Sequence, residues 1–322
     1  MGAAGKTPLV SVVVPTRDRP DALTKAIASI NAQTYESIQL IVVDDSEKSA
    51  EHVLKGLELA AIAETHFIRT ANPQGAAAAR NRGLAAADGT YVAFLDDDDQ
   101  WEPEKLEKQI ARFAAADDDV GVVYTGQRYV DTRGRTTTIR TPTTRGWVAR
   151  DLLRGEPLAP FSTVLVRKTA LDAAGTLDDR FPVWEDREWY LRLATVCAFD
   201  IVPEPLVVRR MGAGDQLSGE FERIRDTAYP LLLETHRPLA ASYGMVPEFE
   251  AATARMLAVA ALDAGAYRDA RRASIRALRA TPTDSASWAY LALSLGGRLT
   301  YGLARTLKRR VSRTQASNNT LP

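Results

Sequence analysis

Four consecutive aspartates, Asp96–Asp99, follow directly on the apolar segment Tyr91–Leu95. Adjacent carboxylates repel one another, and hard divalent cations favour oxygen ligands of this kind, so the cluster predicts a magnesium or manganese site. Such an ion could also hold a diphosphate group. The alternative is that the acids stabilise the N-terminus of a helix expected to begin at Pro103, which would account for Asp99.

Polar residues also follow the first apolar segment of the chain. Leu9–Val14 is followed by Pro15, Thr16 and Arg17, and a second arginine, Arg19, comes two residues later. A strand that ends in such a loop before a helix could cradle part of a nucleotide. Both arginines could equally be surface charges.

The third candidate is a pair of aspartates, Asp44 and Asp45, after the apolar segment Ile38–Val43. A carboxylate in this position can accept hydrogen bonds from a base or a ribose. The alternative is that it caps the helix that follows.

These three apolar segments predict strands of a parallel sheet, because continuous apolar runs are typical of strands buried on both faces. Helical patterns separate the segments, so right-handed crossovers are expected. Ligands bind at the carboxyl ends of strands in such sheets, and the three polar groups should therefore meet at one edge. The other elements expected in this region are a helix over Asp21–Gln33 capped by Asp21, helices over Glu51–Ala63 and Gly75–Ala87, and a strand near Thr65–Arg69.

The predicted fold class is α/β, with a mostly parallel, Rossmann-like sheet flanked by helices and a helical C-terminal appendage. We expect one domain over residues 1–218, with a nucleotide-binding half to about 119 and an acceptor-binding half over 120–218. A helical appendage with a basic tail is expected over 219–314, and a disordered tail over 315–322. Elements expected beyond residue 119 are strands at Val120–Thr125 and Ser162–Val166 and helices at Gly146–Arg154, Asp186–Thr195, Ala254–Leu278 and Ser285–Leu295.

Composition says little about partners, because the 322 residues include 41 basic and 41 acidic side chains. The one cysteine, Cys197, cannot form an intrachain disulfide and fits a reducing compartment, and its apolar neighbours predict a buried packing role. No signal-peptide pattern and no run of about 18 apolar residues is present. We therefore expect a cytoplasmic protein without an ordinary transmembrane helix.

The C-terminal tail is basic, since six Lys or Arg residues and no acid follow Asp284. The segment Trp288–Leu303, rich in Leu, Ala, Tyr and Gly, precedes most of them and could lie on the anionic cytoplasmic face of a membrane. It could equally be a helix packed on the appendage. A nucleic-acid partner is not expected, because the tail lacks a recognisable binding motif.

Several ordered motifs span Leu9 to Ser218. They are VVVPTR (12–17), AQTY (32–35), IVVDD (41–45), NPQGAAAARNRG (72–83), GTYVAFLDDDD (89–99) and WEDREW (184–189). In these motifs the chain resembles the family 2 glycosyltransferases with the GT-A fold. That resemblance implies transfer of a sugar from a nucleotide donor.

The resemblance also implies roles for individual residues. Asp98, with Asp96 beside it, corresponds to the metal ligand of the DxD-type motif. Asp186 corresponds to the catalytic base of the "ED" motif, with Trp184 and Glu185 on the acceptor side. On residue type alone, Asp186 could instead cap a helix. The residues that correspond to nucleotide-sugar contacts are Pro15, Thr16, Arg17, Asp45 at the base, Arg80, and Asp97 at the ribose.

Two departures from the family pattern bear on the diphosphate and on processivity. Members often carry a histidine after the arginine near the end of the domain. Here Arg209 and Arg210 have none after them, so either arginine could contact the diphosphate instead. The QxxRW motif of processive synthases is absent after the "ED" motif, so nonprocessive transfer is expected.

The predicted function is transfer of a single sugar, with inversion, from a nucleotide-diphosphate sugar to a glycan or polyprenyl-linked acceptor. It would serve cell-surface glycan or glycoprotein assembly, and the commonest family donor is a uridine nucleotide. Three alternatives are a polyprenyl-phosphate sugar synthase, a catalytically silent module that binds nucleotide or scaffolds other enzymes, and a nucleotidyltransferase. The last is disfavoured because no Gly-rich phosphate loop with a following Lys is present.

Overall fold

The computed structural model describes residues 7–59, 62–71, 73–210, 217–297 and 301–302. The chain divides into two compact units. The first comprises residues 1–148, 158–179 and 192–211, and the second comprises 149–157, 180–191 and 212–322. Two short segments from the middle of the chain therefore group with the C-terminal helices.

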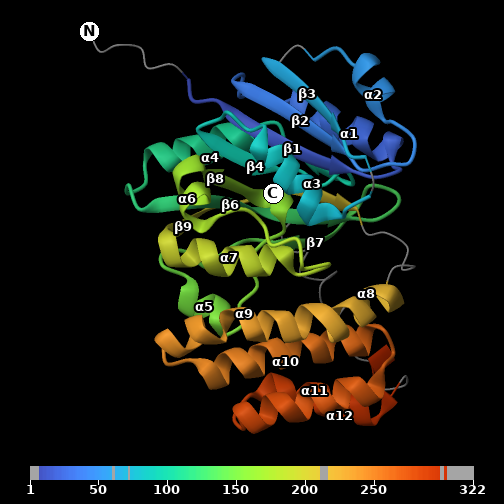
Figure 1. Cartoon of the computed structure of the whole chain (residues 1–322), viewed down its shortest axis with the longest axis vertical. Coiled ribbons are helices and arrows are strands. Elements are labelled where there is room, and N and C mark those ends of the chain that lie inside the picture. Colours follow the sequence, from blue (N-terminus) through green and yellow to red (C-terminus); the bar gives the residue numbers. More distant parts are fainter. Residues whose placement is uncertain (1–6, 60–61, 72, 211–216, 298–300, 303–322) are drawn as a thin grey trace. The chain divides into compact units, whose positions relative to one another are not determined.

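The first unit is built around one sheet, in which nine strands are described (Figure 1). Their order is β3-β2-β1-β4-β8-β6-β9-β5, and β7 pairs with β6. The strands are β1 (Val10–Thr16), β2 (Ile38–Asp44), β3 (Glu64–Arg69), β4 (Tyr91–Phe94), β5 (Asp99–Trp101), β6 (Val120–Val130), β7 (Thr136–Arg140), β8 (Val164–Arg167) and β9 (Ala198–Arg210).

Strands β3, β2, β1 and β4 are mutually parallel, as their apolar sequences predict. Beyond β4 the sheet is mixed. Strand β8 is antiparallel to β4 and β6, β9 is parallel to β6, and β5 is antiparallel to β9. The α/β fold class is confirmed, whereas β5, β7 and β9 were not expected.

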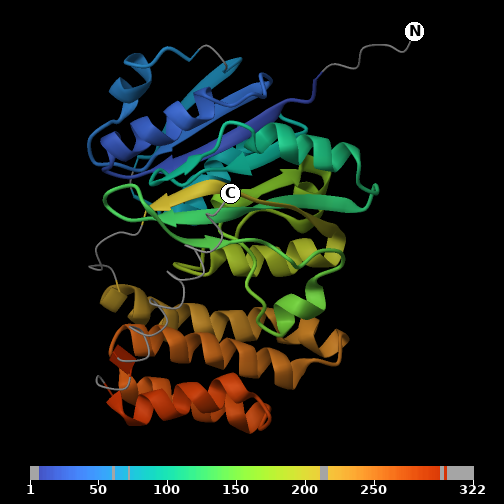
Figure 2. The same cartoon turned by 180° about the vertical axis from the view of Figure 1, so that it is seen from behind.

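Helices cover both faces of the parallel strands, which explains why these strands are apolar throughout. Val10, Val12 and Val14 of β1 share one core cluster with side chains of α1 and α4. Successive residues of a strand point to opposite faces, and Val13 accordingly meets Gly83 of α3. Helix α1 lies toward the viewer in Figure 2, and α3 lies toward the viewer in Figure 1.

The helices of the first unit include those predicted there, with different ends, and two elements that were not expected, over Phe161–Thr163 and Lys168–Ala174. They are α1 (Pro20–Asn31), α2 (Glu51–Lys55), α3 (Ala76–Ala85), α4 (Lys105–Ala114), α6 (Lys168–Ala174) and the 3₁₀ turn η1 (Phe161–Thr163). The prediction that Asp21 caps α1 is wrong. Arg19 holds the N-cap position and Pro20 opens the helix, since proline fits the first turn. Pro103 does not open α4, which begins at Lys105.

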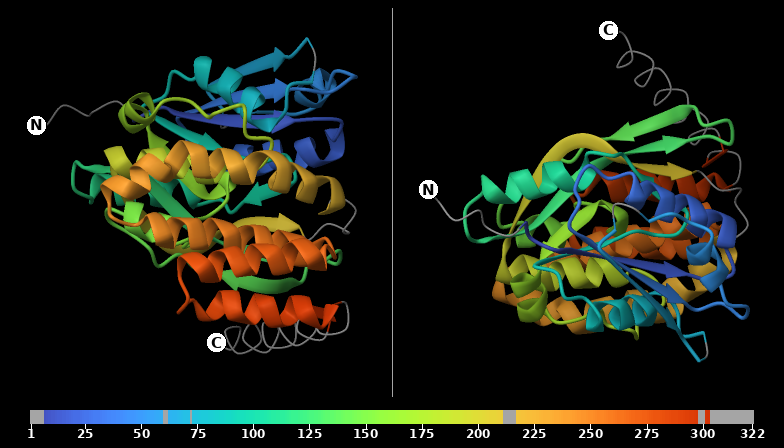
Figure 3. Two further views of the ribbon diagram at one scale, coloured as in Figure 1. Left: turned by 60° about the horizontal axis from the view of Figure 1, so that its bottom comes forward. Right: turned by 90° about the horizontal axis from the view of Figure 1, so that it is seen from above.

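The second unit is helical in its described part. Its helices are α5 (Ala149–Leu153), α8 (Leu217–Arg223), the π-helical turn η2 (Ile224–Ala228), α9 (Tyr229–Ser242), α10 (Val246–Asp263), α11 (Tyr267–Ala280) and α12 (Ser285–Leu295). The segment predicted over Ala254–Leu278 is two helices, because Gly265 takes φ +73° and turns the chain. Figure 3 shows α10, α11 and α12 side by side, and helix α7 (Glu185–Val196) begins in this unit and ends in the first.

Two predictions about the surface and the cysteine can be compared with the structure. Among the described residues, no helix is long and apolar enough to cross a membrane. Arg298, the basic residues from Arg305 onward and the tail 315–322 lie outside the described residues, so membrane contact stays a prediction. Cys197 is buried as expected, and burial raises the pKa of its thiol to about 12.

The close approach of α3 to β1 gives a testable prediction for the fold. A Cβ at Gly83 would lie 2.3 Å from Cγ1 of Val13, whose branched side chain has little freedom to move. We expect Gly83→Ala to lower the free energy of unfolding by about 1–3 kcal/mol through overpacking. Urea denaturation measures this, with Gly56→Ala as the control because its Cβ would meet nothing nearer than 3.7 Å. Equal stability of the two variants would contradict the packing described.

Candidate active site

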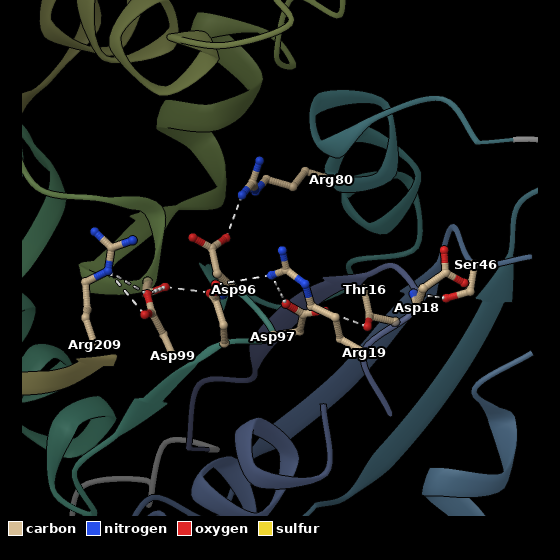
Figure 4. Close-up of polar contacts among 11 residues, drawn as sticks. Thr16, Asp18, Arg19, Ser46, Arg80, Asp96, Asp97, Asp99 and Arg209 are labelled. Atoms are coloured by element: carbon tan, nitrogen blue, oxygen red, sulfur yellow. Dashed lines mark hydrogen bonds and ion pairs between the residues drawn. The ribbon is translucent and has the colours of Figure 1, made fainter. Parts of the chain in front are cut away.

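The carboxyl ends of β1 and β4 meet, as predicted for polar residues at strand ends. Thr16, the last residue of β1, donates its hydroxyl to Oδ2 of Asp97 at 2.7 Å. Arg19, which follows three residues later, places Nη1 3.4 Å from Oδ1 of Asp97 and 3.2 Å from Oδ2 of Asp98 (Figure 4). Arg19 is therefore a counter-charge to the acidic cluster and not simply a surface arginine.

A strained residue turns the loop between Thr16 and Arg19. Asp18 has φ +55°, a left-handed conformation that is uncommon outside glycine. Its backbone N–H donates to Oγ of Ser46 at 2.7 Å, and its carboxylate accepts from the N–H of Glu47 at 3.1 Å. These bonds hold the turn that sends Arg19 back toward the acids. The side chain of Arg17, a predicted nucleotide contact, is exposed. Its Nε lies 3.8 Å from Oδ2 of Asp18.

Asp96 is paired with an arginine from α3. Nη2 of Arg80 lies 2.6 Å from Oδ1 of Asp96, and the guanidinium lies 4.2 Å over the ring of Phe161. Arg80 is buried, so this ion pair holds α3 beside the acidic cluster. The predicted site residues Arg80 and Asp96 are thus in direct contact.

Asp99 is held by a partner 110 residues away. It begins β5 and pairs in register with Arg209 of β9, whose Nε lies 3.1 Å from its Oδ2. Ser162 donates its hydroxyl to Asp99 at 2.7 Å and accepts from the backbone N–H of Asp96 at 3.2 Å. The proposed alternative role of Asp99 as a cap of α4 is wrong, because Asp99 lies in a strand.

The environment raises the pKa of two of the four carboxyl groups. Burial raises the pKa of Asp97, against the opposing effects of Thr16 and Arg19. Burial also raises the pKa of Asp99 to about 7, although Arg209 opposes it. Burial alone would lower the pKa of Arg209, but the charge of Asp99 raises it above its ordinary value. In total, four carboxyl groups of this cluster contact three guanidinium groups.

Asp98 differs from its neighbours in being open to solvent. Its side chain is 55% exposed, against 23% for Asp96 and 8% for Asp97. Among the described residues, no set of three His, Cys, Asp or Glu side chains is placed to hold a metal ion alone. One or two carboxylates combined with substrate phosphates is a usual arrangement for Mg²⁺, and Asp98 with Asp96 fits that donor set.

Asp45 lies at the same edge, because its backbone N–H donates to the carbonyl of Thr16 at 2.9 Å. Its buried carboxylate accepts from the hydroxyl of Thr70 at 2.5 Å and from the N–H groups of Gln74 and Gly75 at 3.0 and 3.2 Å. Gly75 is the N-cap of α3. Asp45 therefore shapes the loop before α3, and its contact with a nucleobase stays a prediction.

The residues of the "ED" motif belong to the second unit. Trp184 has φ +66°, a left-handed conformation, directly before α7, and its carbonyl accepts from the N–H of Glu188 at 3.0 Å. Glu185 and Asp186 form the first turn of α7, and Asp186 accepts from the N–H of Arg187 at 2.7 Å. Backbone strain of this kind concentrates at functional sites. The positive φ of Trp184 therefore marks the segment that contains Asp186, the predicted base.

The structure thus brings together Thr16, Arg80, Asp96, Asp97 and Asp98 from the predicted set. Asp45 lies beside them, Pro15 lies next to Thr16 in β1, and Arg17 is turned outward. The predicted acceptor-side residues and the predicted base, Trp184, Glu185 and Asp186, belong to the second unit. Ser162 and the counter-charge role of Arg19 were missed, since no local pattern marks either residue. Arg209 was named only as a possible diphosphate contact.

Comparisons with solved structures bear on the fold. The fold resembles that of Staphylococcus aureus TarS, residues 1–349, in complex with UDP-GlcNAc, with a TM-score of 0.56 and 17% identity over 89% of this chain and 90% of that one. The TarS 1–349 structure without that ligand gives a TM-score of 0.58 at 15% identity. The predicted GT-A fold, an α/β sheet with a helical C-terminal region, is confirmed.

The family follows from the sequence itself. Residues 11–172 match the profile of glycosyl transferase family 2, and the chain belongs to that family. A UDP-Glc:α-D-GlcNAc-diphosphoundecaprenol β-1,3-glucosyltransferase of Escherichia coli is 37% identical over 103 residues, which cover 32% of this chain and 40% of that protein. The O-antigen biosynthesis protein RfbC of Myxococcus xanthus is 30% identical over 217 residues, 66% of this chain and 16% of that protein. The chain therefore matches less than half the length of these relatives.

The pair of Asp99 and Arg209 gives a testable prediction for the site. Replacing the arginine in Arg209→Met leaves a carboxylate that is 2% exposed without its cation, so we expect a loss of about 2–3 kcal/mol in the free energy of unfolding. The double variant Asp99→Asn/Arg209→Met should lose less than the sum of the single changes. Chemical denaturation measures all three, with the exposed neighbour in Arg210→Met as the control. An Arg209→Met protein as stable as Arg210→Met would show that the pair is not needed.

Proposed function

We propose that this protein transfers a single sugar from a nucleotide-diphosphate sugar to a hydroxyl of a glycan acceptor in cell-surface polysaccharide assembly. Membership of family 2 supports the reaction class. The relatives named for O-antigen synthesis and for a diphosphoundecaprenol-linked acceptor support the polysaccharide setting. The TarS complex supports a UDP sugar as donor. The observation that carries the proposal is the convergence of Thr16, Arg80, Asp96, Asp97 and Asp98 at one edge of the sheet.

Charge explains why this edge would bind the donor together with a cation. Four carboxyl groups against three guanidiniums leave the cluster without excess positive charge, so a diphosphate needs an additional cation there. Asp98, with Asp96, would hold Mg²⁺ or Mn²⁺. Held there, such an ion would supply positive charge for the negative charge that develops on the departing diphosphate. Asp97 takes the ribose and Asp45 the base in this proposal.

The chain's own residues account for the remaining chemistry. The acceptor oxygen forms a bond to the anomeric carbon while the bond from that carbon to the diphosphate oxygen breaks. The bonding electron pair leaves with the nucleoside diphosphate. Asp186 accepts the proton of the acceptor hydroxyl as general base. A single displacement of this kind inverts the configuration of the anomeric carbon.

The metal role of Asp98 is tested by Asp98→Asn, which keeps the size of the side chain but removes its charge. We expect kcat/KM for sugar transfer to fall about 10²–10³-fold, because stabilisation of the leaving diphosphate is lost. Release of nucleoside diphosphate in the presence of Mg²⁺ or Mn²⁺ measures this. Asp118→Asn, at an exposed turn, is the matched control and should keep full activity. An Asp98→Asn protein as active as the Asp118→Asn control would contradict the metal role of Asp98.

The role of Asp186 is tested by Asp186→Asn. We expect transfer to a hydroxyl acceptor to fall about 10²–10⁴-fold, as is usual when a general base is removed, while the Kd for the donor stays the same. The same variant separates the alternative of a polyprenyl-phosphate sugar synthase, since an ionised phosphate oxygen needs no base. Undiminished transfer to a polyprenyl phosphate, detected by lipid extraction, would replace the hydroxyl-acceptor proposal with that alternative.

A further inference from the structure

The second unit contains a pocket that the proposed chemistry does not use. Its volume is about 500 Å³, within the range of small-molecule sites. Three aromatic side chains, Trp184, Phe221 and Tyr290, line it, and Met256 and Val259 of α10 are among its aliphatic wall residues. They come from the segment before α7 and from α8, α10 and α12, so the pocket is formed by several elements of one compact unit.

Charged groups interrupt this apolar wall at three positions. Glu220 and Asp263 are both lining residues, and within the described part of the chain no hydrogen bond or ion pair is made by the Glu220 carboxylate. Asp263 accepts from the hydroxyl of Tyr301 at 2.6 Å. Arg255 is the third, and Asp284 holds its guanidinium at 2.7 Å. The lining therefore has two carboxylates and one cation that is already neutralised.

This combination discriminates among ligand classes. A polyprenyl chain would fill the pocket with hydrocarbon and leave the Glu220 carboxylate facing it without a hydrogen-bond partner, which is costly. A phosphate or diphosphate would face two carboxylates without an unpaired cation. A neutral sugar suits both features, because a pyranose ring has an apolar face of C–H groups for the aromatic rings and hydroxyl donors for the carboxylates.

The pocket is joined to the predicted base through the chain. Trp184 is a wall residue and stands two positions before Asp186. Its left-handed backbone, and the hydrogen bond that its carbonyl accepts from the N–H of Glu188, fix it to the first turn of α7. Glu188 is itself buried, with Oε1 3.2 Å from Nε2 of His236 on α9. Trp184 of the aromatic wall and the predicted base therefore lie on one well-anchored segment.

We propose that this pocket binds a neutral saccharide portion of the acceptor, one that does not itself react. The inference deepens the proposed function and rests on it for the word acceptor. The saccharide-binding site itself does not depend on transfer. The geometry assigns the partly exposed Trp184 and Tyr290 to stacking on the sugar and Glu220 to its hydroxyl groups, while Phe221 is buried in the core beside them.

Saturation-transfer NMR on the full chain, without donor or metal, tests the site. The probes are cellobiose, lactose, maltose and di-N-acetylchitobiose, with farnesyl phosphate and UDP as comparison ligands. We expect at least one disaccharide to bind, and Glu220→Gln to weaken that binding about tenfold or more through loss of hydrogen bonds to a charged group. Ala260→Phe, which adds a ring to the pocket wall, should abolish it. Glu222→Gln changes an exposed carboxylate two residues from Glu220 and should bind as the unmodified protein does.

Each result decides the proposal. Disaccharide binding that is lost in Ala260→Phe and weakened in Glu220→Gln supports it, provided both variants keep their circular dichroism spectrum and melting temperature. No disaccharide binding, or binding indifferent to both changes, overturns it. Displacement of the bound sugar by farnesyl phosphate also overturns it, in favour of a lipid site. Nucleoside diphosphate release, measured separately, distinguishes this failure from failure of the proposed transfer, because saccharide binding is read without donor.

Discussion

The repulsion among Asp96, Asp97, Asp98 and Asp99 is the interaction on which the first unit depends. Three guanidiniums balance it, and each comes from a different element: Arg19 after β1, Arg80 from α3 and Arg209 from β9. The parallel pairing of β1 with β4 and the antiparallel pairing of β5 with β9 bring these partners to one edge. The order of the strands in the sheet therefore also sets which arginines lie beside the aspartates. Because the balance leaves no surplus positive charge, the proposed binding of a diphosphate at this edge would need an added cation.

Much of this edge could be predicted from short stretches of sequence. The continuous apolar runs before Thr16, Asp44 and Asp96 identify strands buried on both faces, and parallel strands bring their carboxyl ends together. The contact between Asp99 and Arg209 could not be predicted, because it depends on pairing between segments 110 residues apart. Strand β5 has three residues, too few for a periodic pattern. The left-handed conformation of Asp18 was equally hidden, since few residues other than glycine adopt it and no local pattern marks this one.

The second unit shows a different limit of sequence reasoning. Segments 149–157 and 180–191 group with the C-terminal helices, whereas the sequence indicated one boundary near residue 218. The first segment joins that unit through Gly155 and the carbonyl of Arg154, which contact Ala252 and Arg255 of α10. Helix packing of this kind depends on small residues and backbone groups, which carry no periodic signal. The saccharide pocket is built from the same unit, so the proposed acceptor side has its own folded framework.

The central claim is that the acidic edge binds a nucleotide-diphosphate sugar only together with a divalent cation. Isothermal titration of the full chain with UDP-GlcNAc and UDP-glucose, in Mg²⁺, in Mn²⁺ and in excess EDTA, tests it most directly. The account predicts saturable binding of a donor in one or both metals and a Kd at least about tenfold weaker in EDTA, a difference of about 1.4 kcal/mol. Equal affinity in EDTA, or no binding of either donor under any condition, would contradict it.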